Sequence, residues 1–285
     1  MTVSLCVVAV LLLAASPRCK AANWHKQPAF GHRPRRHTSL PDPVANFYHT
    51  KDKLCTMKLL DIDCDYMCDY FDQSFVGGQF GSNRFERNHL KLLRDHAEHN
   101  CLISYGEWHG PVALFWLNAR RHNYVQAFEP DPMAFGRLHA NLASYGRRAR
   151  VHHMCVNADG KKSYIETKGY SSSKLLQSGV YAVSCVSYEQ LRADYPECSH
   201  KVDVEGFETV LIDHIIEDPP PFLSLSVHSP FIAAMGSAAN DTFYGKLSQL
   251  EALYASCVRA EDDWANKSGR DFFEFVCWNR LVSWS

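Results

Sequence analysis

Two short acidic strings carry the residues of this chain that could do chemistry. The first covers residues 128–132 and reads FEPDP after an apolar run, and the second covers residues 201–206 and reads KVDVEG about seventy residues later. Proline or glycine follows the acids in both strings, so the acids fall at the carboxyl ends of two predicted strands. An open α/β sheet binds its ligands at such ends. The sequence therefore indicates an enzyme with its site at one edge of a sheet.

Glu129 in the first string follows a glycine turn by about twenty residues. Gly106 and Gly110 flank that turn, which comes after a predicted strand and opens a helix, so its backbone can approach a ligand and the helix N-terminus can bind an anionic group. At the spacing of Glu129, a carboxylate accepts hydrogen bonds from both hydroxyls of a ribose. A plain tight turn and an acid that stabilises a helix dipole are the structural alternatives.

Asp203 and Glu205 in the second string lie two residues apart on a predicted strand, so their side chains point to the same side. One could hold a charged amine of a ligand, and the other could shape an acceptor pocket or take a proton, because a buried pair of like charges raises one pKa. Lys201 shares that face and would offset their charge. His228, after the next predicted strand, would stand beside Asp203 as general base for a hydroxyl. The alternative for Asp203 and Glu205 is that they simply lie in solvent at the end of a strand.

Alternating strands and helices predict a mostly parallel sheet with helices on both faces. The final predicted strand alternates like an edge or penultimate strand. The predicted strands are 101–105, 124–128, 151–156, 181–186, one that Asp203 closes, 222–227 and 272–278, and the predicted helices are 83–99, one that starts near 111, 131–145, 188–192, 208–216 and 243–255.

The length of 285 residues suits one full-sized α/β domain plus an extension. The net charge of −1 provides no global field that would attract nucleic acid or an anionic membrane. We therefore expect no nucleic acid partner, and any specificity must come from a local site. The predicted parts are a signal peptide or short signal anchor at 1–22, a basic Pro-rich linker at 23–50, a helical N-terminal extension at 51–100 and the catalytic domain at 101–285.

The N-terminal segment and the cysteines favour the secretory pathway, in the ER or Golgi lumen or outside the cell. About thirteen apolar residues in 3–15 are too few to span a bilayer and fit a signal-peptide core. The basic stretch behind them leaves a two-part organellar signal as the alternative. Of 11 cysteines, several should pair in an oxidising lumen, and one should stay unpaired. Asn240 and Asn266 head glycosylation tripeptides.

Cys64 and Cys68 share the spacing of one helix face, which raises the question of a metal site. No second Cys/His pair at zinc-like spacing lies nearby in the sequence, so a disulfide or packing role is the better interpretation. We expect no metal at the site.

These residues, in this order, resemble the FkbM family of S-adenosylmethionine-dependent methyltransferases. The shared features are the Phe-Glu-Pro string at 128–130, a late Asn141 in the following helix, and the string KVDVEGFE at 201–208, within a similarity that covers about 102–227. The resemblance implies a class I methyltransferase (Rossmann-like) fold, a mostly parallel seven-stranded sheet whose last strands include one antiparallel member. It also implies that S-adenosylmethionine is used to methylate oxygen, often on a sugar or polyketide, without a metal.

Carried over residue by residue, the resemblance assigns Glu129 to the ribose of the cofactor and Asp203 and Glu205 to the methyl-transfer site. Ser104, Gly106 and Gly110 would lie along its methionine part. The family's Asp-x-Gly-Ala-Asn-x-Gly reads SYGEWHG here, and Ser226 replaces an acid often found on the fifth strand. The expected function is O-methylation of a sugar, glycan or small-molecule hydroxyl. A catalytically inactive binding module of the same fold, or a dinucleotide-dependent oxidoreductase, are the alternatives.

Overall fold

The computed structural model describes residues 53–68, 86–97, 99–166, 174–176, 179, 181–260 and 272–279. The predicted signal segment, the linker and the acceptor at Asn266 lie outside these residues. Within the described part of the chain, every helix falls short of the length and apolarity that a bilayer crossing requires.

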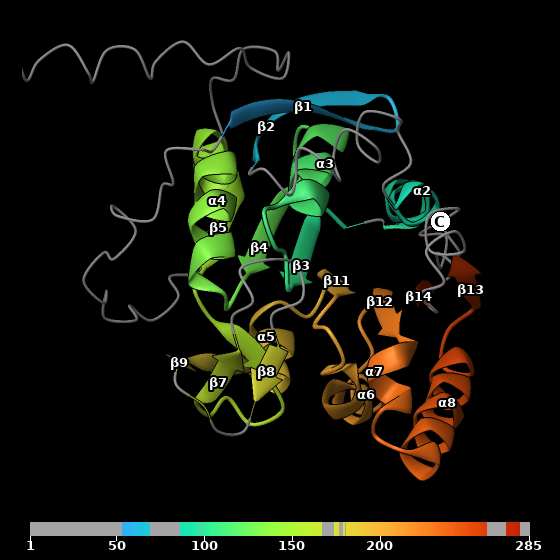
Figure 1. The fold of residues 1–285 in the computed structure, drawn as a ribbon. Helices are drawn as coiled ribbons and strands as arrows, with labels where there is room; N and C mark the ends of the chain where they lie inside the picture. The colour runs from blue at the N-terminus through green and yellow to red at the C-terminus, as the bar shows by residue number, and fades with distance from the viewer. Residues whose placement is uncertain are drawn as a thin grey trace, which may run out of the picture.

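A seven-stranded central sheet has the order β13-β14-β12-β11-β3-β4-β5 (Figure 1). Six strands are parallel, and only β14 runs against its two neighbours. The chain adds β4 and β5 on one side of β3 and then adds β11 and β12 on the other, so the switch point lies between β3 and β11. This is the class I methyltransferase arrangement, and it confirms the predicted fold. The strands are β3 (Cys101–Tyr105), β4 (Tyr124–Phe128), β5 (Ala149–His152), β11 (Ser199–Val202), β12 (Phe222–His228), β13 (Ser256–Ala260) and β14 (Phe272–Trp278).

Helices cover both faces of this sheet because its central strands are apolar on both sides. On β3, Leu102 packs into one apolar cluster and Ile103 into the other, as the alternation of a strand requires. The first cluster contains the buried sides of α2 (Arg87–His96), α3 (Pro111–Ala119) and α4 (Pro132–Leu142). The second contains those of α5 (Tyr188–Asp194), α6 (Glu208–Glu217), α7 (Ser229–Ala233) and α8 (Ser237–Glu251).

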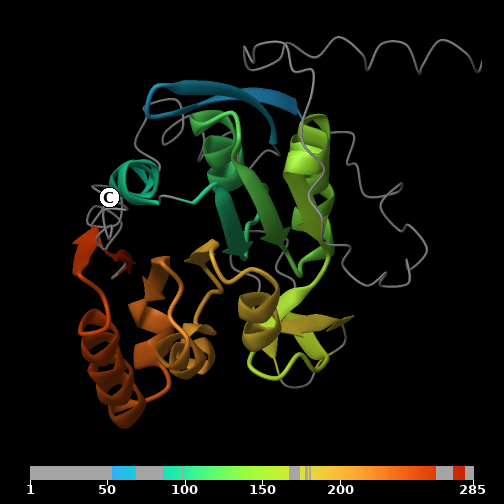
Figure 2. The same cartoon turned by 180° about the vertical axis from the view of Figure 1, so that it is seen from behind.

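The region 51–100 differs from its predicted helical form. Residues 53–68 form a hairpin of β1 (Lys53–Leu59) and β2 (Ile62–Cys68), and among the residues of this region that the structure describes, α2 is the helical element. Met57 and Leu59 on one strand and Cys64 and Tyr66 on the other are buried at every second position, which is the period of a strand. The hairpin lies against α3 and α4, as both views show (Figures 1 and 2).

Two predicted strands are each divided between separate sheets. The predicted strand at 151–156 becomes β5 and then β6 (Cys155–Asn157), and the one at 181–186 becomes β9 (Tyr181–Val183) and β10 (Cys185–Ser187). β6 pairs with β10, while β9 joins β7 (Ser163–Glu166) and β8 (Lys174–Leu176) in a small antiparallel sheet. The break at His153 and Met154 turns the chain away from the central sheet. A 3₁₀ segment, η3 (Ala143–Arg148), precedes β5.

Disulfides join six of the described cysteines, as Cys101–Cys198, Cys155–Cys185 and Cys257–Cys277. The first ties β3 to β11, and the last joins register partners on β13 and β14. The expectation that several cysteines pair is therefore confirmed. Cys64 is buried and accepts a hydrogen bond from the Asn118 amide at 3.4 Å, which fits the packing role expected of it.

Removing the β3–β11 cross-link should cost more stability than removing the edge cross-link. Cys101 and Cys198 are 97 residues apart in sequence, whereas Cys257 and Cys277 are 20 apart, and a longer closed loop restricts the unfolded chain more. We expect Cys101→Ala/Cys198→Ala to lose about 4–5 kcal/mol of unfolding free energy and Cys257→Ala/Cys277→Ala about 3 kcal/mol. Urea titrations of both double variants measure this, and the reverse order would contradict it.

Candidate active site

The turn after β3 brings the two acidic strings together at the switch point. The N–H groups of Gly106 and Glu107 both donate to the carbonyl of Phe128, at 2.9 and 3.2 Å. The N–H of Asp203 donates to the carbonyl of Tyr105 at 3.0 Å. The ends of β3, β4 and β11 are thus fixed to one another by backbone hydrogen bonds, as the prediction of a common edge requires.

Gly106 is the residue on which this junction is built. Its φ is +69°, and a Cβ placed there would lie 1.8 Å from the carbonyl oxygen of Asp203. Gly110 has a φ of +98° as the N-cap of α3, and a Cβ there would lie 2.8 Å from Cδ1 of Leu138. Gly106 is therefore required by the packing of the backbone around it, and Gly110 by its left-handed conformation.

Glu107 occupies the N-terminus of α3, a role that the sequence analysis did not assign. Its buried carboxylate accepts hydrogen bonds from the Ser104 hydroxyl and, at 2.7 Å, from the N–H of Ala113. Burial raises the pKa of Glu107. An anionic ligand group would compete with this carboxylate for the helix N-terminus, which corrects the expectation that the turn offers it to a ligand. Ser104, buried on β3, faces Glu107.

Glu129 lies directly after β4 and is 6% exposed. Its Oε2 accepts from the N–H of Trp108 at 2.7 Å and its Oε1 from the N–H of Asp131 at 2.8 Å. Burial is the main cause that raises its pKa to about 8, with the charge of Asp131 adding to it against the two N–H hydrogen bonds. In the ionised carboxylate, each oxygen keeps a further lone pair that can accept a hydrogen bond from a hydroxyl.

Asp131, and not Glu129, caps the helix that follows. The Asp131 side chain accepts hydrogen bonds from the N–H groups of Met133 and Ala134, at 2.8 and 3.1 Å, as an N-cap does. Asp131 therefore performs the helix-capping role that was the structural alternative for Glu129.

Asp203, Glu205 and His228 come together as predicted, although the two acids lie on the loop beyond β11 while His228 is the last residue of β12. β11 ends at Val202, and Glu205 has the left-handed φ of 51°. The conformation of the loop, and not strand alternation, therefore brings the Asp203 and Glu205 side chains to the same side. His228 Nε2 lies 3.5 Å from Asp203 Oδ1 and 3.7 Å from Glu205 Oε2. On the far side of Asp203, Lys201 Nζ donates to Oδ2 at 2.7 Å.

Glu208 completes this cluster, and the sequence analysis gave it no role of its own. It is fully buried, and its Oε1 lies 2.7 Å from Nδ1 of His228. The available signal was its place three residues after Glu205, at the start of a helix that begins beside the strand ends. The cluster now has three carboxylates and two cations, and its formal charge is negative by one; its members are Lys201, Asp203, Glu205, Glu208 and His228.

The charges in this cluster do not suit His228 as a general base. Burial favours the neutral ring, but Glu208, Glu205 and Asp203 outweigh it and raise the pKa of His228 to about 10. Likewise, burial of Asp203 is outweighed by Lys201 and His228, which lower its pKa. At neutral pH the imidazole is protonated and the Asp203 carboxyl ionised, which corrects the expectation of a free base at His228.

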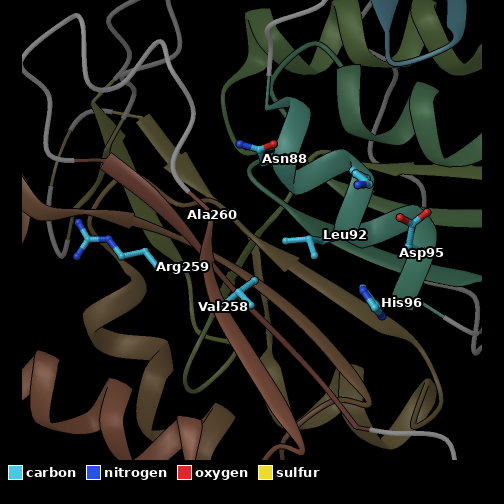
Figure 3. Close-up of a pocket in the computed structure, with 8 residues that line it drawn as sticks. Asn88, Leu92, Asp95, His96, Val258, Arg259 and Ala260 are labelled. Atoms are coloured by element: carbon cyan, nitrogen blue, oxygen red, sulfur yellow. The ribbon is translucent and has the colours of Figure 1, made fainter.

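A separate groove lies between α2 and β13 (Figure 3). Its volume is about 470 Å³, and none of the predicted site residues lines it. Leu92 and His96 of α2 lie across it from Val258 of the edge strand. It is thus a surface feature of the sheet edge, away from the strand ends.

Comparisons with known proteins add little to this topology. No protein-family model and no curated protein matches the chain. Similar solved structures include precorrin-6y C5,15-methyltransferase from Geobacter metallireducens, 13% identical over 70% of this chain and 88% of that one, with a TM-score of 0.39. The fibrillarin pre-rRNA processing protein of Methanococcus jannaschii is 12% identical over 85% of this chain and 86% of its own, with a TM-score of 0.41.

A third similar structure is the tRNA (uracil-54, C5)-methyltransferase of Pyrococcus abyssi in complex with S-adenosyl-L-homocysteine. It is 13% identical over 79% of this chain and 43% of its own, with a TM-score of 0.43. Because the sequence identities and TM-scores of these similar structures are low, the fold is assigned from the strand order of the sheet and not from the similarity.

Gly106→Ala should destabilise the protein far more than Gly146→Ala. Both positions have a positive φ, but a Cβ at 146 meets nothing within 4 Å, whereas one at 106 collides with the Asp203 backbone. We expect a loss of about 1 kcal/mol at 146 and at least about 3 kcal/mol at 106. Thermal melts of both variants measure the difference, and equal losses would contradict the close approach.

The stabilising contribution of His228 should disappear at alkaline pH. Its pKa rises from 6.5 to about 10 in the fold, so the contribution is complete below pH 6.5 and is lost as the pH rises through about 10. The unfolding free energy of the wild type minus that of His228→Gln should shrink across this window. A difference that stays constant across it would show that His228 is not held as a cation.

Proposed function

We propose that the chain is an S-adenosylmethionine-dependent O-methyltransferase, similar to the FkbM family, that acts on a hydroxyl of a glycan or small molecule. The observation that carries the proposal is the placement of Glu129. Glu129 follows the second strand of the sheet at the switch point and lies across the glycine turn from the Asp203 loop. Its carboxylate is available for a ligand because Asp131 caps the helix that follows.

The residues fit a sulfonium nucleoside at the ribose and at its positively charged groups, but less well at the glycine turn. Glu129 has acceptor capacity for the ribose hydroxyls, and the negative cluster beyond Gly106 suits a ligand that carries positive charge on both its sulfonium and its amine. The turn fits less closely, because Glu107 fills the helix N-terminus and Trp108 stands where the family has a small residue. Ser104, Gly106 and Gly110 would then border the methionine part through their backbone.

When bound, S-adenosylmethionine supplies an electrophilic methyl group. The protein must align an acceptor hydroxyl with it and accept one proton. Glu205 is the residue we assign to the proton, since its carboxylate is 23% exposed while Glu208 is buried behind it. Asp203, held ionised by Lys201, would orient the amine, and protonated His228 is a positioning residue that fixes the two acids.

We also propose a lumenal location for the protein. Three disulfides among the described residues support an oxidising compartment. Together with the apolar N-terminal segment, they favour the ER or Golgi lumen or secretion, with membrane attachment only through an N-terminal anchor. No nucleic acid partner is proposed.

The inactive binding module is retained as a second candidate because of Glu107. A carboxylate in the N-terminus of α3, in place of the family's small residues, would weaken the methionine site. Such a protein would bind the nucleoside part without transferring methyl.

Above about pH 8, where Glu129 is ionised, Glu129→Gln should weaken binding of S-adenosylhomocysteine by at least about tenfold. An amide cannot accept from both ribose hydroxyls while it keeps its two backbone partners. The matched control is Glu217→Gln, an exposed carboxylate at the end of α6. Calorimetric titration of both variants, with a melting curve for each, separates lost binding from lost folding.

The same titration should depend on pH in the wild type. Ionised Glu129 accepts hydrogen bonds better than the protonated acid, so affinity should rise as the pH passes about 8, and Glu129→Gln should lack this rise. Equal affinity in wild type and variant would remove Glu129 from the site. Binding without labelled methyl transfer to a glycan and metabolite panel would favour the inactive module, and no binding to the wild type would refute both candidates.

A further inference from the structure

His109, inside the glycine turn, is fixed by side chains from two other elements. Its Nε2 lies 3.2 Å from Nη1 of Arg137 on α4, and its Nδ1 lies 3.1 Å from the hydroxyl oxygen of Tyr66 on β2. The carbonyl of His109 accepts a hydrogen bond from the Asn141 amide of α4 at 2.7 Å. His109, Arg137 and Tyr66 are all buried. The imidazole is thus held between the N-terminal hairpin and α4.

These contacts determine the tautomer of His109. A guanidinium has only donors, so Arg137 donates this hydrogen bond and Nε2 of His109 accepts it. The ring proton is therefore on Nδ1, and the Tyr66 oxygen accepts a hydrogen bond from it. A buried N–H group needs an acceptor, and the hairpin provides it through the Tyr66 hydroxyl.

Trp108 is linked to His109 by its ring as well as by the chain. The two rings are stacked, with their centroids 4.4 Å apart and their planes at 21°. The φ of Trp108 is +54°, a left-handed conformation that is costly for a bulky residue. The Trp108 ring also packs against the apolar cluster that contains Met57 and Leu59 of the hairpin. The stack and this packing therefore stabilise a backbone conformation that the residue type disfavours.

The backbone conformation of Trp108 determines where its N–H group points. This N–H donates to Oε2 of Glu129 at 2.7 Å, while Oε1 accepts from the N–H of Asp131. Asp131 belongs to the same segment as Glu129, whereas Trp108 belongs to the turn after β3. The Trp108 N–H is therefore the contact that fixes the Glu129 carboxylate to the glycine turn.

We propose that His109 is a positioning residue for Glu129 and that Tyr66 makes the N-terminal hairpin part of the same site. His109 holds the stacked ring, and thereby the backbone, of Trp108. The Trp108 N–H in turn holds the carboxylate that would face the ribose. The ligand part of this inference rests on the proposed function of Glu129, whereas the link from the hairpin to Glu129 rests on the contacts themselves.

The sequence gives only one sign of this arrangement. Trp108 and His109 are bulky residues for a turn between two glycines, which indicates that other parts of the chain hold their rings. Tyr66 lies 43 residues before His109 and reaches it only in the fold. Because residues 53–68 form a hairpin and not a helix, strand alternation places Tyr66 on the buried side.

The test follows the titration of Glu129 by NMR of its carboxyl carbon in the full chain without ligand, with the resonance assigned by its loss in Glu129→Gln. The Trp108 N–H favours the ionised carboxylate, so loss of this contact should raise the pKa of Glu129 further above its usual range. We expect Tyr66→Phe and His109→Ala to raise the titration midpoint by at least about half a pH unit. The midpoint at which the affinity for S-adenosylhomocysteine rises should move by the same amount.

Tyr254→Phe is the matched control. Tyr254 is also buried, and its hydroxyl donates a hydrogen bond to the carbonyl of Pro220 at 2.8 Å, on the other face of the sheet. This variant should lose stability in a urea titration as Tyr66→Phe does, because each loses one buried hydroxyl. It should leave the titration of Glu129 unchanged.

Two measurements on the wild type do not depend on the folding of any variant. The NMR shifts of the His109 ring nitrogens should show the proton on Nδ1. The Trp108 amide proton should titrate with the same midpoint as the Glu129 carboxyl, because the two groups are hydrogen-bonded. A proton on Nε2 of His109, or a Trp108 amide that does not follow Glu129, would overturn the proposal.

An unchanged Glu129 midpoint in folded Tyr66→Phe and His109→Ala, or an equal rise in Tyr254→Phe, would overturn it as well. Failure of the proposed function gives a different result. If the Glu129 midpoint moves as expected but the wild type binds no S-adenosylhomocysteine, the positioning role of His109 stands and the ribose role of Glu129 is lost.

Discussion

The absence of a side chain at Gly106 is the constraint on which the site depends. The backbone of this residue lies so close to the Asp203 carbonyl that any Cβ would overlap it. Hydrogen bonds from the same turn reach Phe128, at the end of β4. One tight turn therefore sets the positions of both acidic strings, at the ends of β4 and β11.

The sheet could be predicted from the sequence because its strands are apolar runs with clear ends. β3 and β4 coincide with the predicted strands, and β12 extends one residue further, to His228. The hairpin at 53–68 was missed because its cysteines and acids resemble a polar helix until burial shows a period of two. The small sheets were missed because the turns at 153–154 and 184 interrupt runs that look continuous.

The candidate site could be predicted in position but not in protonation. The acids were placed at the sheet edge by the residues that end each strand, whereas the state of His228 depends on Glu208, which is twenty residues away and reaches it only in the fold. The same holds for Glu107. Its carboxylate looks out of place in a glycine turn, and only the structure shows that it accepts a hydrogen bond from the N–H of Ala113 in the first turn of α3.

The disulfide between Cys101 and Cys198 sits at the starts of β3 and β11, and the reacting groups we propose sit at the opposite tips. The disulfide thus joins the two central strands at the ends opposite the proposed site. Reduction of this disulfide would affect the site only indirectly, through the rigidity of β3 and β11. Sulfur chemistry and any chemistry at the acids are kept apart by the length of one strand.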